Sequence, residues 1–347
     1  TEGYDKLREA LVKRLVERDG MKAEGNSIII TSGSQQGLDL LGRIFLDKDD
    51  VVIVEAPSYV GALNAFRTHR PVFEPTWMDE DGIRMDILRE NIKHVQQHGG
   101  NIKFLYTIPT FHNPAGTTMP LKRRKELLEI ASEYDLLVVE DDPYSEVRFT
   151  DEVLPKLKSM DKENRVIYLG TFSKTLAPGF RCAWAFGPEE AINKMSIAKQ
   201  AADLCTNTFT QCIAYEYLKR GYLDQHLASA RELYKHKAEA MIGAMRKYFP
   251  EEVKYNVPKG GMFIWARLPR NVNVREMFPR AVEQNVSYVP GDAFYPNGDG
   301  KNCMRLNFTN ATDDLIEEGM RRLGKLIKEE IVRARTCEKP PLPPASV

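Results

Sequence analysis

The residues with the clearest chemical potential lie in the run Thr171–Arg181, which reads TFSKTLAPGFR. A lysine amine can form an imine with a carbonyl, because it loses its proton more readily than a guanidinium does. Arginine suits a phosphate ester instead, since its planar fork of donors matches the phosphate oxygens. Lys174 could therefore bond to a molecule whose phosphate lies among Thr171, Ser173 and Arg181. Taken alone, the run could equally be a surface turn with solvated charges.

Short apolar segments rich in Val and Ile alternate with longer segments of helical period, which is typical of an α/β fold with a mostly parallel sheet. The sequence predicts strands over residues 28–31, 51–55, 103–108, 136–140, 166–170 and 181–187. It predicts a helix over residues 121–134, with Leu121, Leu127, Leu128 and Ala131 on one face. Ligands of such sheets bind beyond the carboxyl ends of the strands. Residues that follow the predicted strands are therefore the candidates for chemistry.

Two candidate groups follow the first and second strands. Ser34 and Gln35 open a predicted helix, where backbone N–H groups and the helix dipole favour a phosphate. An ordinary serine N-cap fits the same residues. Tyr59 follows the second strand and could stack on a flat ring, although a lone tyrosine there is more often a core residue.

Two further groups follow the third and fourth strands. A carboxylate at a buried strand end needs a cationic partner, and the protonated nitrogen of a pyridine ring would serve Asp141 in this way. Tyr144 and Asn113 could then donate to a phenolic oxygen on the same ring. The alternatives are an Asn-Pro turn at Asn113, and a helix cap or magnesium site at the adjacent Asp141 and Asp142.

These signals are weak one by one, but they recur strand after strand in one predicted sheet. The aldehyde, phosphate, pyridine nitrogen and phenolic oxygen that they would serve all belong to one molecule. The sequence therefore predicts pyridoxal 5'-phosphate as the cofactor.

Composition narrows the remaining options. A chain of 347 residues predicts two domains, which we place at residues 1–229 and 230–347. Lys plus Arg and Asp plus Glu number 49 each, which gives no electrostatic reason to expect a nucleic acid or a membrane as partner. The five cysteines lack CxxC spacing, and we expect no metal site. With neither a long apolar run nor a secretory signal, we expect a cytoplasmic protein that acts on small molecules.

Seven segments resemble the fold-type I, pyridoxal-phosphate-dependent class I and II aminotransferases. The resemblance is to the branch that contains 2-aminoadipate, kynurenine and broad-specificity aminotransferases, and it spans nearly the whole chain. The segments are SGSQQGLDL (32–40), EAPSY (55–59), FHNPAG (111–116), VVEDDPY (138–144), GTFSKTLAPGFR (170–181), PKGGMFIW (258–265) and MRLNF (304–308).

The resemblance implies a large cofactor-binding domain, with a mostly parallel seven-stranded sheet between helices, a smaller C-terminal α+β domain, and a homodimer. It implies that Lys174 forms the Schiff base, that Asp141 pairs with the pyridinium, and that Arg305 binds the substrate α-carboxylate beside Asn113. Tyr144 and Asn113 would donate to the ring oxygen. Tyr59 would stack on the ring, and Ser34, Gln35, Thr171, Ser173 and Arg181 would bind the phosphate.

The implied reaction moves an amino group from an L-amino acid to a 2-oxo acid, with 2-oxoglutarate expected, in a ping-pong cycle with Lys174 as the proton-shuttling base. The alternatives are racemase, decarboxylase or β-lyase chemistry, and the effector domain of a pyridoxal-phosphate-dependent transcription regulator.

The sequence departs from the family pattern at two points. Members usually carry several dozen residues before the position of Thr1, including part of the small domain, and this sequence has no counterpart. Ala183 stands where relatives commonly have glycine, and we expect no chemical consequence.

Overall fold

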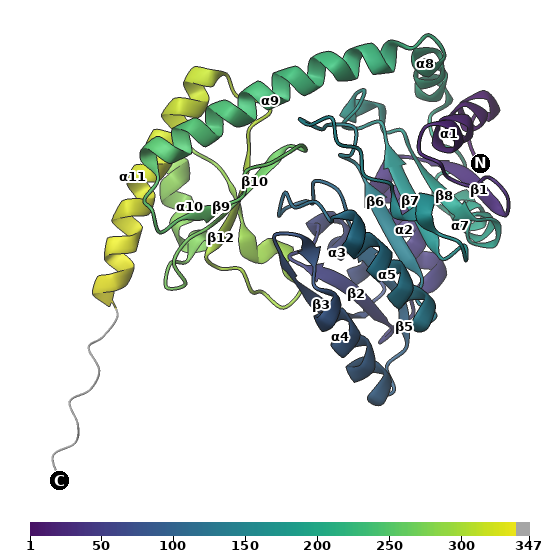
Figure 1. Ribbon diagram of the computed structural model, residues 1–347, viewed down its shortest axis with the longest axis horizontal. Helices are drawn as coiled ribbons and strands as arrows, with labels where there is room; N and C mark the ends of the chain where they lie inside the picture. The colour runs from purple at the N-terminus through teal and green to yellow at the C-terminus, as the bar shows by residue number, and fades with distance from the viewer. Residues whose placement is uncertain (338–347) are drawn as a thin grey trace.

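A computed structural model describes residues 1–337 of the chain as two lobes. One lobe is built around an eight-stranded sheet and the other around a four-stranded sheet, and helix α9 (Tyr222–Tyr248) runs unbroken between them (Figure 1). The predicted domain boundary between residues 229 and 230 falls inside α9, so a division there remains a proposal. The sequence also predicts an extended or frayed end from Cys337 on, because the four prolines after it cannot sustain a helix. Cys337 instead ends helix α11 (Asp313–Cys337), and the prolines lie outside the described residues.

The larger sheet has the strand order β1-β8-β7-β6-β5-β2-β3-β4. Its strands are β1 (Asn26–Thr31), β2 (Val51–Ala56), β3 (Val72–Asp79), β4 (Gly82–Ile83), β5 (Ile102–Thr107), β6 (Val138–Asp142), β7 (Val166–Thr171) and β8 (Ala183–Pro188). The pairs from β3 through β7 are parallel, whereas β8 is antiparallel to both β7 and β1. Two reversals leave β1 parallel to β7. The carboxyl ends of β1, β2, β5, β6 and β7 therefore meet at one edge.

The predicted fold class is confirmed, and each of the six predicted strands is present with shifted ends. The structure adds β3 and β4, which the sequence analysis missed. β3 carries Pro75, and most of its residues are partly exposed, so it lacks the apolar pattern of a buried strand. The proline is tolerated because the outer side of β3 is paired only at Met78 and Asp79. The two-residue β4 brings the sheet to eight strands rather than seven.

Helices cover both faces of the larger sheet, and strand alternation decides which residues each helix meets. Val54 and Tyr106 pack in the core under α2 and α3, whereas their neighbours Ile53 and Leu105 pack in the core under α4 and α5. The covering helices are α1 (Asp5–Glu17), α2 (Ser34–Phe45), α3 (Val60–Arg67), α4 (Met85–Gln97), α5 (Leu121–Glu133), α6 (Leu157–Met160), α7 (Glu189–Ala202) and α8 (Thr208–Lys219).

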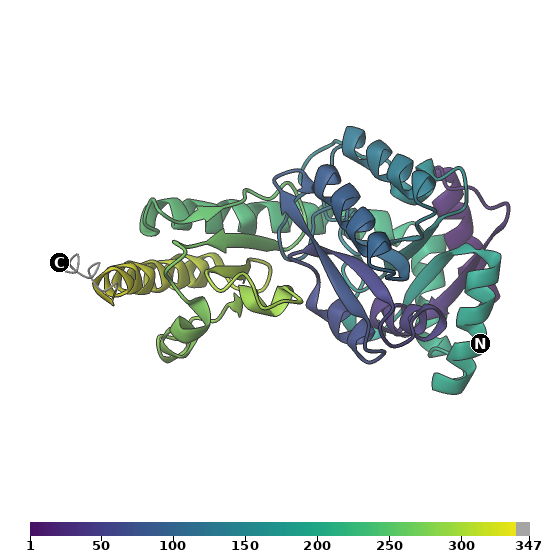
Figure 2. The same cartoon turned by 90° about the horizontal axis from the view of Figure 1, so that it is seen from below.

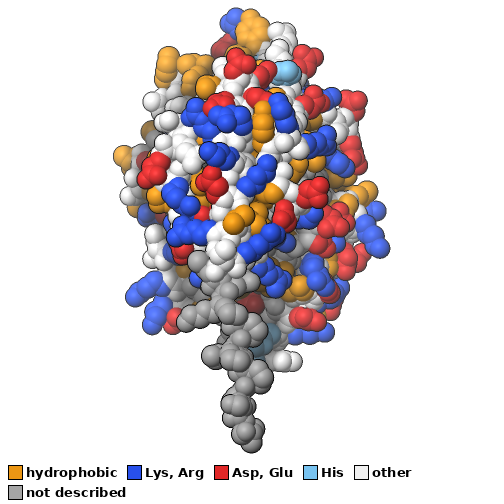
Figure 3. Space-filling model, turned by 90° about the vertical axis from the view of Figure 1, so that its left-hand side faces the viewer, with side chains coloured by type: hydrophobic (Ala, Val, Ile, Leu, Met, Phe, Trp, Pro, Cys, Tyr) orange, Lys and Arg blue, Asp and Glu red, His pale blue; other side chains and the backbone are white. Residues whose placement is uncertain are grey.

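The smaller lobe packs three helices against an antiparallel sheet of order β11-β12-β10-β9 (Figure 2). Its elements are α9, β9 (Lys254–Tyr255), β10 (Phe263–Arg267), α10 (Val274–Glu283), β11 (Val289–Pro290), β12 (Cys303–Asn307) and α11 (Asp313–Cys337), with short 3-10 helices at Pro178–Phe180 and Gly291–Phe294. The surface at this end of the molecule mixes basic and acidic side chains (Figure 3), in keeping with the balanced charge. No helix within residues 1–337 has the length and apolar character needed to cross a membrane.

Helix α5 differs from its predicted pattern in one respect that matters for the site. Leu121 is exposed and Leu128 only partly buried, while Arg124 is fully buried. Its guanidinium donates to the carbonyl oxygens of Met119 (2.8 Å) and Pro109 (3.0 Å). Two further bonds go to the Pro155 carbonyl and the Thr110 hydroxyl. Arg124 therefore fastens both ends of the loop that carries Asn113, a role that periodicity does not reveal.

We expect Arg124→Met to lower the free energy of unfolding by about 2–4 kcal/mol, because several buried acceptors lose their donor. Urea denaturation measures the change. Lys122→Met on the exposed face of α5 is the matched control, expected to stay within about 0.5 kcal/mol of the wild type. Equal losses in both variants would contradict this role of Arg124.

Candidate active site

A pocket with a cavity volume of about 400 Å³ lies at the carboxyl edge of the larger sheet, with one wall from the smaller lobe. It brings together all the site residues proposed from the sequence: Ser34, Gln35, Tyr59, Asn113, Asp141, Tyr144, Thr171, Ser173, Lys174, Arg181 and Arg305. The lining residues that the sequence analysis did not propose are Val60, Ile108, Pro143, Pro178 and Phe263. The parallel strand ends explain this convergence, because they deliver distant segments to one edge.

Asp141 is a buried carboxylate with one unused acceptor. Its Oδ2 accepts a hydrogen bond from the Tyr106 hydroxyl (2.7 Å), and its Oδ1 has no hydrogen-bond partner among the described residues. Burial raises the pKa of Asp141 to about 7, against the opposing effect of the Tyr106 bond. Tyr106 thus orients Asp141, a role that the sequence analysis missed although Tyr106 lies in a predicted strand.

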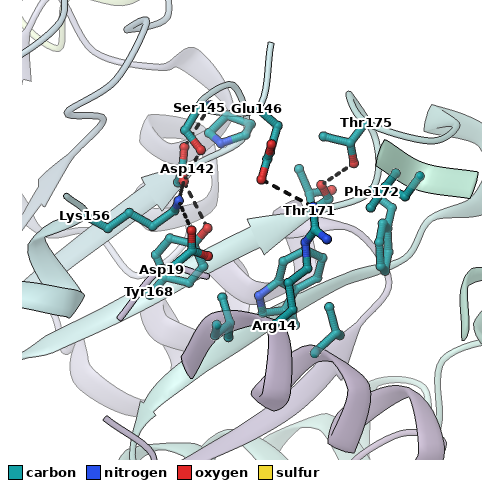
Figure 4. A pocket seen from close by; sticks show the side chains of 15 residues that line it. Arg14, Asp19, Asp142, Ser145, Glu146, Lys156, Tyr168, Thr171, Phe172 and Thr175 are labelled. Carbon is teal, nitrogen blue, oxygen red and sulfur yellow. Dashed lines mark hydrogen bonds and ion pairs between the residues drawn. The ribbon is translucent and has the colours of Figure 1, made fainter. Parts of the chain in front are cut away.

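Asp142 faces the other side of the sheet, because successive strand residues alternate. It accepts from the hydroxyls of Tyr168 (3.0 Å) and Ser145 (2.7 Å). The Lys156 ammonium, which is 3.6 Å from Asp142 and 3.0 Å from Asp19, completes a separate polar pocket (Figure 4). Two carboxylates on opposite faces cannot hold one ion, so the magnesium alternative loses its geometric basis.

Three side chains form a chain of hydrogen bonds across the two lobes. Nη1 of Arg305, on β12, donates to Asn113 Oδ1 (2.8 Å). Nδ2 of Asn113 in turn donates to the Tyr144 hydroxyl (3.3 Å). Burial raises the pKa of Tyr144, which therefore stays protonated and able to donate. A carboxylate bound by Arg305 would thus lie close to the groups proposed for the cofactor's ring oxygen.

The loop that carries Asn113 is held by a buried pair that the sequence analysis did not find. Nδ1 of His112 accepts from the Ala115 backbone N–H (3.2 Å), so its proton belongs on Nε2, which lies 3.0 Å from a Glu55 oxygen. Glu55 also accepts from the Thr107 hydroxyl and the Ile108 backbone N–H. His112 therefore links the end of β2 to the Asn113 loop.

Lys174 lies in the turn after β7. Its amine forms neither a hydrogen bond nor an ion pair with any described residue. Burial lowers the pKa of this amine, and the charges of Arg305 and Arg181 lower it further. A lower pKa increases the fraction of neutral amine at a given pH. The neutral amine is the form that attacks a carbonyl or accepts a proton.

A cradle for an anion lies beside Lys174. The Thr171 hydroxyl donates to the Ser173 hydroxyl (3.1 Å) and accepts from the Ser173 backbone N–H (3.0 Å). Gly33 has φ 78°, and a Cβ there would lie 1.9 Å from a terminal nitrogen of Arg181, so only glycine admits this guanidinium. The cradle therefore combines Arg181 with the amino end of α2.

Two of the predicted residues have details that the sequence could not show. The side chain of Gln35 donates to the Gly61 carbonyl (2.7 Å), which leaves its backbone N–H as the group available to an anion. A Cβ on Gly61 would lie only 2.5 Å from the nearest atoms of the Tyr59 side chain, so the lack of a side chain at Gly61 leaves room for the tyrosine. Burial raises the pKa of Tyr59, and the charge of Asp141 raises it further.

Comparison with known proteins identifies the class. Residues 1–323 match the family model described as aminotransferase class I and II. Aromatic-amino-acid aminotransferase 1 of Thermococcus litoralis is 48% identical, over 95% of this chain and 79% of that protein. The 2-aminoadipate transaminase of Thermus thermophilus is 43% identical, over 94% and 80%. A crystal structure of Pyrococcus horikoshii kynurenine aminotransferase superposes with a TM-score of 0.93 at 51% identity, over 95% and 81%.

The chain belongs to the class I and II aminotransferases. More particularly, it is a pyridoxal-phosphate-dependent transaminase of the branch with aromatic-amino-acid, 2-aminoadipate and kynurenine aminotransferases. Two uncharacterised transcription regulators of Bacillus subtilis are also similar, but at only 32% and 33% identity. The regulator alternative is therefore not favoured.

The residues present fit pyridoxal 5'-phosphate. The unpartnered Oδ1 of Asp141 suits a protonated ring nitrogen, and the unpartnered amine of Lys174 suits an aldehyde. The glycine-dependent cradle at Arg181 suits a phosphate. Each fit concerns a different part of the cofactor.

We expect Tyr106→Phe to weaken cofactor binding by about 5- to 10-fold, since Asp141 loses the hydrogen bond that orients it. The dissociation constant of pyridoxal phosphate, measured by equilibrium dialysis, tests this. Tyr168→Phe is the matched control, because it removes a tyrosine–aspartate bond on the opposite face. Equal weakening in both variants would show that the effect is not specific to Asp141.

The raised pKa of Asp141 predicts a pH dependence in the cofactor-free protein. Between about pH 4 and 7 the unfolded side chain is ionised while the folded one keeps its proton, so stability falls as pH rises and levels off above pH 7. Asp141→Asn removes this dependence. Its stability advantage over the wild type should grow across that window, to about 4 kcal/mol at most.

Thermal unfolding of both cofactor-free proteins at pH 5 and pH 8 measures this difference. Burial also raises the pKa of Glu140 to about 7, but Glu140 is present in both proteins and cancels. An advantage of the Asn variant that is equal at both pH values would contradict the prediction.

Proposed function

We propose that this transaminase uses Lys174 as its covalent anchor and proton shuttle, and that it prefers amino donors with a large apolar or aromatic side chain. The proposal rests on one observation. Three groups that have no oppositely charged partner among the described residues line the same pocket. These are the free oxygen of Asp141, the amine of Lys174 and the guanidinium of Arg305. They match a ring nitrogen, an aldehyde and a substrate carboxylate, respectively.

When bound, pyridoxal phosphate supplies the aldehyde that takes up the amino group and a ring that accepts electrons from the substrate α-carbon. Asp141 would keep the ring nitrogen protonated, while Tyr144 and Asn113 would donate to the ring oxygen. Tyr59 would stack on the ring. Ser34, the backbone of Gln35, Thr171, Ser173 and Arg181 would hold the phosphate.

The substrate enters with its carboxylate on Arg305, which places its α-carbon toward Lys174. Lys174 would hold the cofactor through its aldehyde, and the free amine of Lys174 would act as the base that takes up and returns the proton of the substrate α-carbon. Its lowered pKa supports the role, because a neutral amine is needed. The same groups act in reverse when the 2-oxo acid binds, with 2-oxoglutarate as the expected acceptor.

The donor preference rests on the pocket lining and on the relatives. Val60, Ile108 and Phe263 give the pocket apolar walls. Within the described lining, the three cations are Lys174, Arg181 and Arg305, and each already has a proposed partner. No further cation of that lining is left for a distal carboxylate. The names of the Thermococcus litoralis and Pyrococcus horikoshii relatives also point to aromatic substrates.

We also propose a homodimer. Ile197 on α7, Leu204 in the segment after α7 and Phe209 at the start of α8 are exposed apolar residues that a second copy can cover. Light scattering at several concentrations would measure the mass. A cytoplasmic location stays a prediction from the sequence.

We expect Lys174→Ala to lower turnover by at least about 10³-fold, because general base catalysis alone contributes about 10²–10⁴-fold. Lys174→Arg is the matched control: it keeps the positive charge but cannot supply the neutral amine, and it should be equally inactive. The measurement is product formation at saturating cofactor. Robust transamination by either variant would overturn the assignment of Lys174.

The donor preference is tested by adding amino acids to the cofactor-loaded wild type and following its visible absorbance. Phenylalanine should discharge the absorbance band faster than alanine or 2-aminoadipate, and 2-oxoglutarate should restore it. Discharge that is fastest with 2-aminoadipate would refute the preference while leaving the transaminase assignment intact.

A further inference from the structure

Arg305 is a partly buried cation without an acidic partner. Its backbone is fixed, because β12 lies between β10 and β11 and pairs Arg305 with Trp265 and Val289. No carboxylate of residues 1–337 forms an ion pair with it, and Asn113 Oδ1 is its hydrogen-bond acceptor. A desolvated guanidinium in this state is costly unless something else compensates its charge.

Two aromatic rings supply that compensation. The guanidinium carbon of Arg305 lies 4.1 Å from the ring centre of Phe263 and 5.0 Å from that of Phe294. Both distances are within the range of cation–π attraction, which strengthens when the cation is desolvated. The rings attract the charge but offer no acceptor oxygen. They therefore hold the guanidinium without occupying the donors that would bind a carboxylate.

The two rings are themselves held by edge-to-face contacts. Phe263 packs against Tyr144, with centroids 5.8 Å apart and planes at 84°, and Phe294 packs against Trp265 at 5.6 Å and 89°. Phe294 is fully buried, and Phe263 is exposed only at the pocket wall. Neither ring is free to turn away, so the position of Arg305 is fixed from β10 and from the segment before β12.

We propose that Phe263 and Phe294 are positioning residues for carboxylate recognition, keeping Arg305 charged, dehydrated and aimed without a protein carboxylate to compete with the substrate. The inference rests on the proposed role of Arg305 as the carboxylate-binding group. Loss of either ring removes none of the groups proposed to bind the cofactor; at Phe263 it removes an edge-to-face contact of Tyr144, whose hydrogen bond with Asn113 remains. It therefore weakens the binding of substrate acids and leaves the chemical step nearly unchanged.

The test uses the cofactor-loaded full chain and the variants Phe263→Leu and Phe294→Leu. The probe is 3-phenylpropanoate, a carboxylate with neither an amino nor an oxo group, titrated by calorimetry beside its neutral amide. Steady-state KM and kcat for phenylalanine are measured in parallel. Phe263→Tyr keeps the aromatic face, and Phe308→Leu removes a buried ring of the same lobe that pairs with Phe149 rather than forming one of the two cation–π contacts of Arg305.

We expect both leucine variants to raise the dissociation constant of 3-phenylpropanoate and the KM for phenylalanine by about 3- to 30-fold, with kcat within about threefold. Binding of the amide should not change in Phe294→Leu, and in Phe263→Leu, which also alters the apolar wall, it should weaken less than binding of the acid. Phe263→Tyr should stay close to the wild type, as should Phe308→Leu. If Phe294→Leu does not fold, Phe263→Leu at the pocket wall decides the question.

Unchanged 3-phenylpropanoate binding in Phe263→Leu would overturn the proposal, as would an equal loss in Phe308→Leu or a loss confined to kcat. These outcomes leave the transaminase assignment standing if the wild type still converts its substrates. A wild type that binds the probe but transfers no amino group would instead overturn the proposed function.

Discussion

The charge of Asp141 is the constraint on which the site depends. A carboxylate buried at the end of a central strand is unfavourable unless a proton or a cation accompanies it, and the raised pKa expresses that cost. The protein satisfies only one of the two oxygens, through Tyr106. The other oxygen is left for a ligand that brings its own positive charge, so the folded chain selects a protonated ring.

The same reasoning extends to Arg305, which lines the same pocket. Among the described residues Arg305 has no acidic partner, just as Asp141 has no cationic one. A bound pair of cofactor and substrate supplies both missing charges. The pocket therefore offers one site for a positive group, at Asp141, and another for a negative group, at Arg305.

Much of this site could be predicted from the sequence, because its residues come directly after apolar segments that are easily recognised as strands. Once the strands are parallel, their carboxyl ends must meet, so Asn113, Tyr144 and Lys174 are brought together by topology alone. Strand β3 was not predicted, because Pro75 and its partly exposed residues do not give the apolar pattern of a buried strand. The residues that support the site were harder to predict. Tyr106 reads as an ordinary strand residue, and Arg124 reads as part of a polar helix face.

Phe294 and Glu55 show why the residues that support the site cannot be predicted from local sequence patterns. Phe294 lies against Arg305 of β12, and Glu55 at the end of β2 lies beside His112 in the loop after β5. Neither partner lies at a helical or strand spacing in the chain. Their roles depend on which strands are neighbours, which is a property of the sheet order rather than of any local pattern.

The position of β1 in the larger sheet has a consequence for how the chain acquires its fold. Asn26 pairs with Pro188, and β8 is the strand that links β1 to the rest of the sheet. During synthesis, the apolar residues Ile28–Ile30 have no partner strand until β8 is made, which comes after most of the larger lobe. Helix α1, whose Leu7 and Leu11 pack in the same core as Ile28 and Ile30, can shelter one face of β1 meanwhile. The amino end of the anion cradle is thus translated well before β8, the strand that fixes it in the sheet.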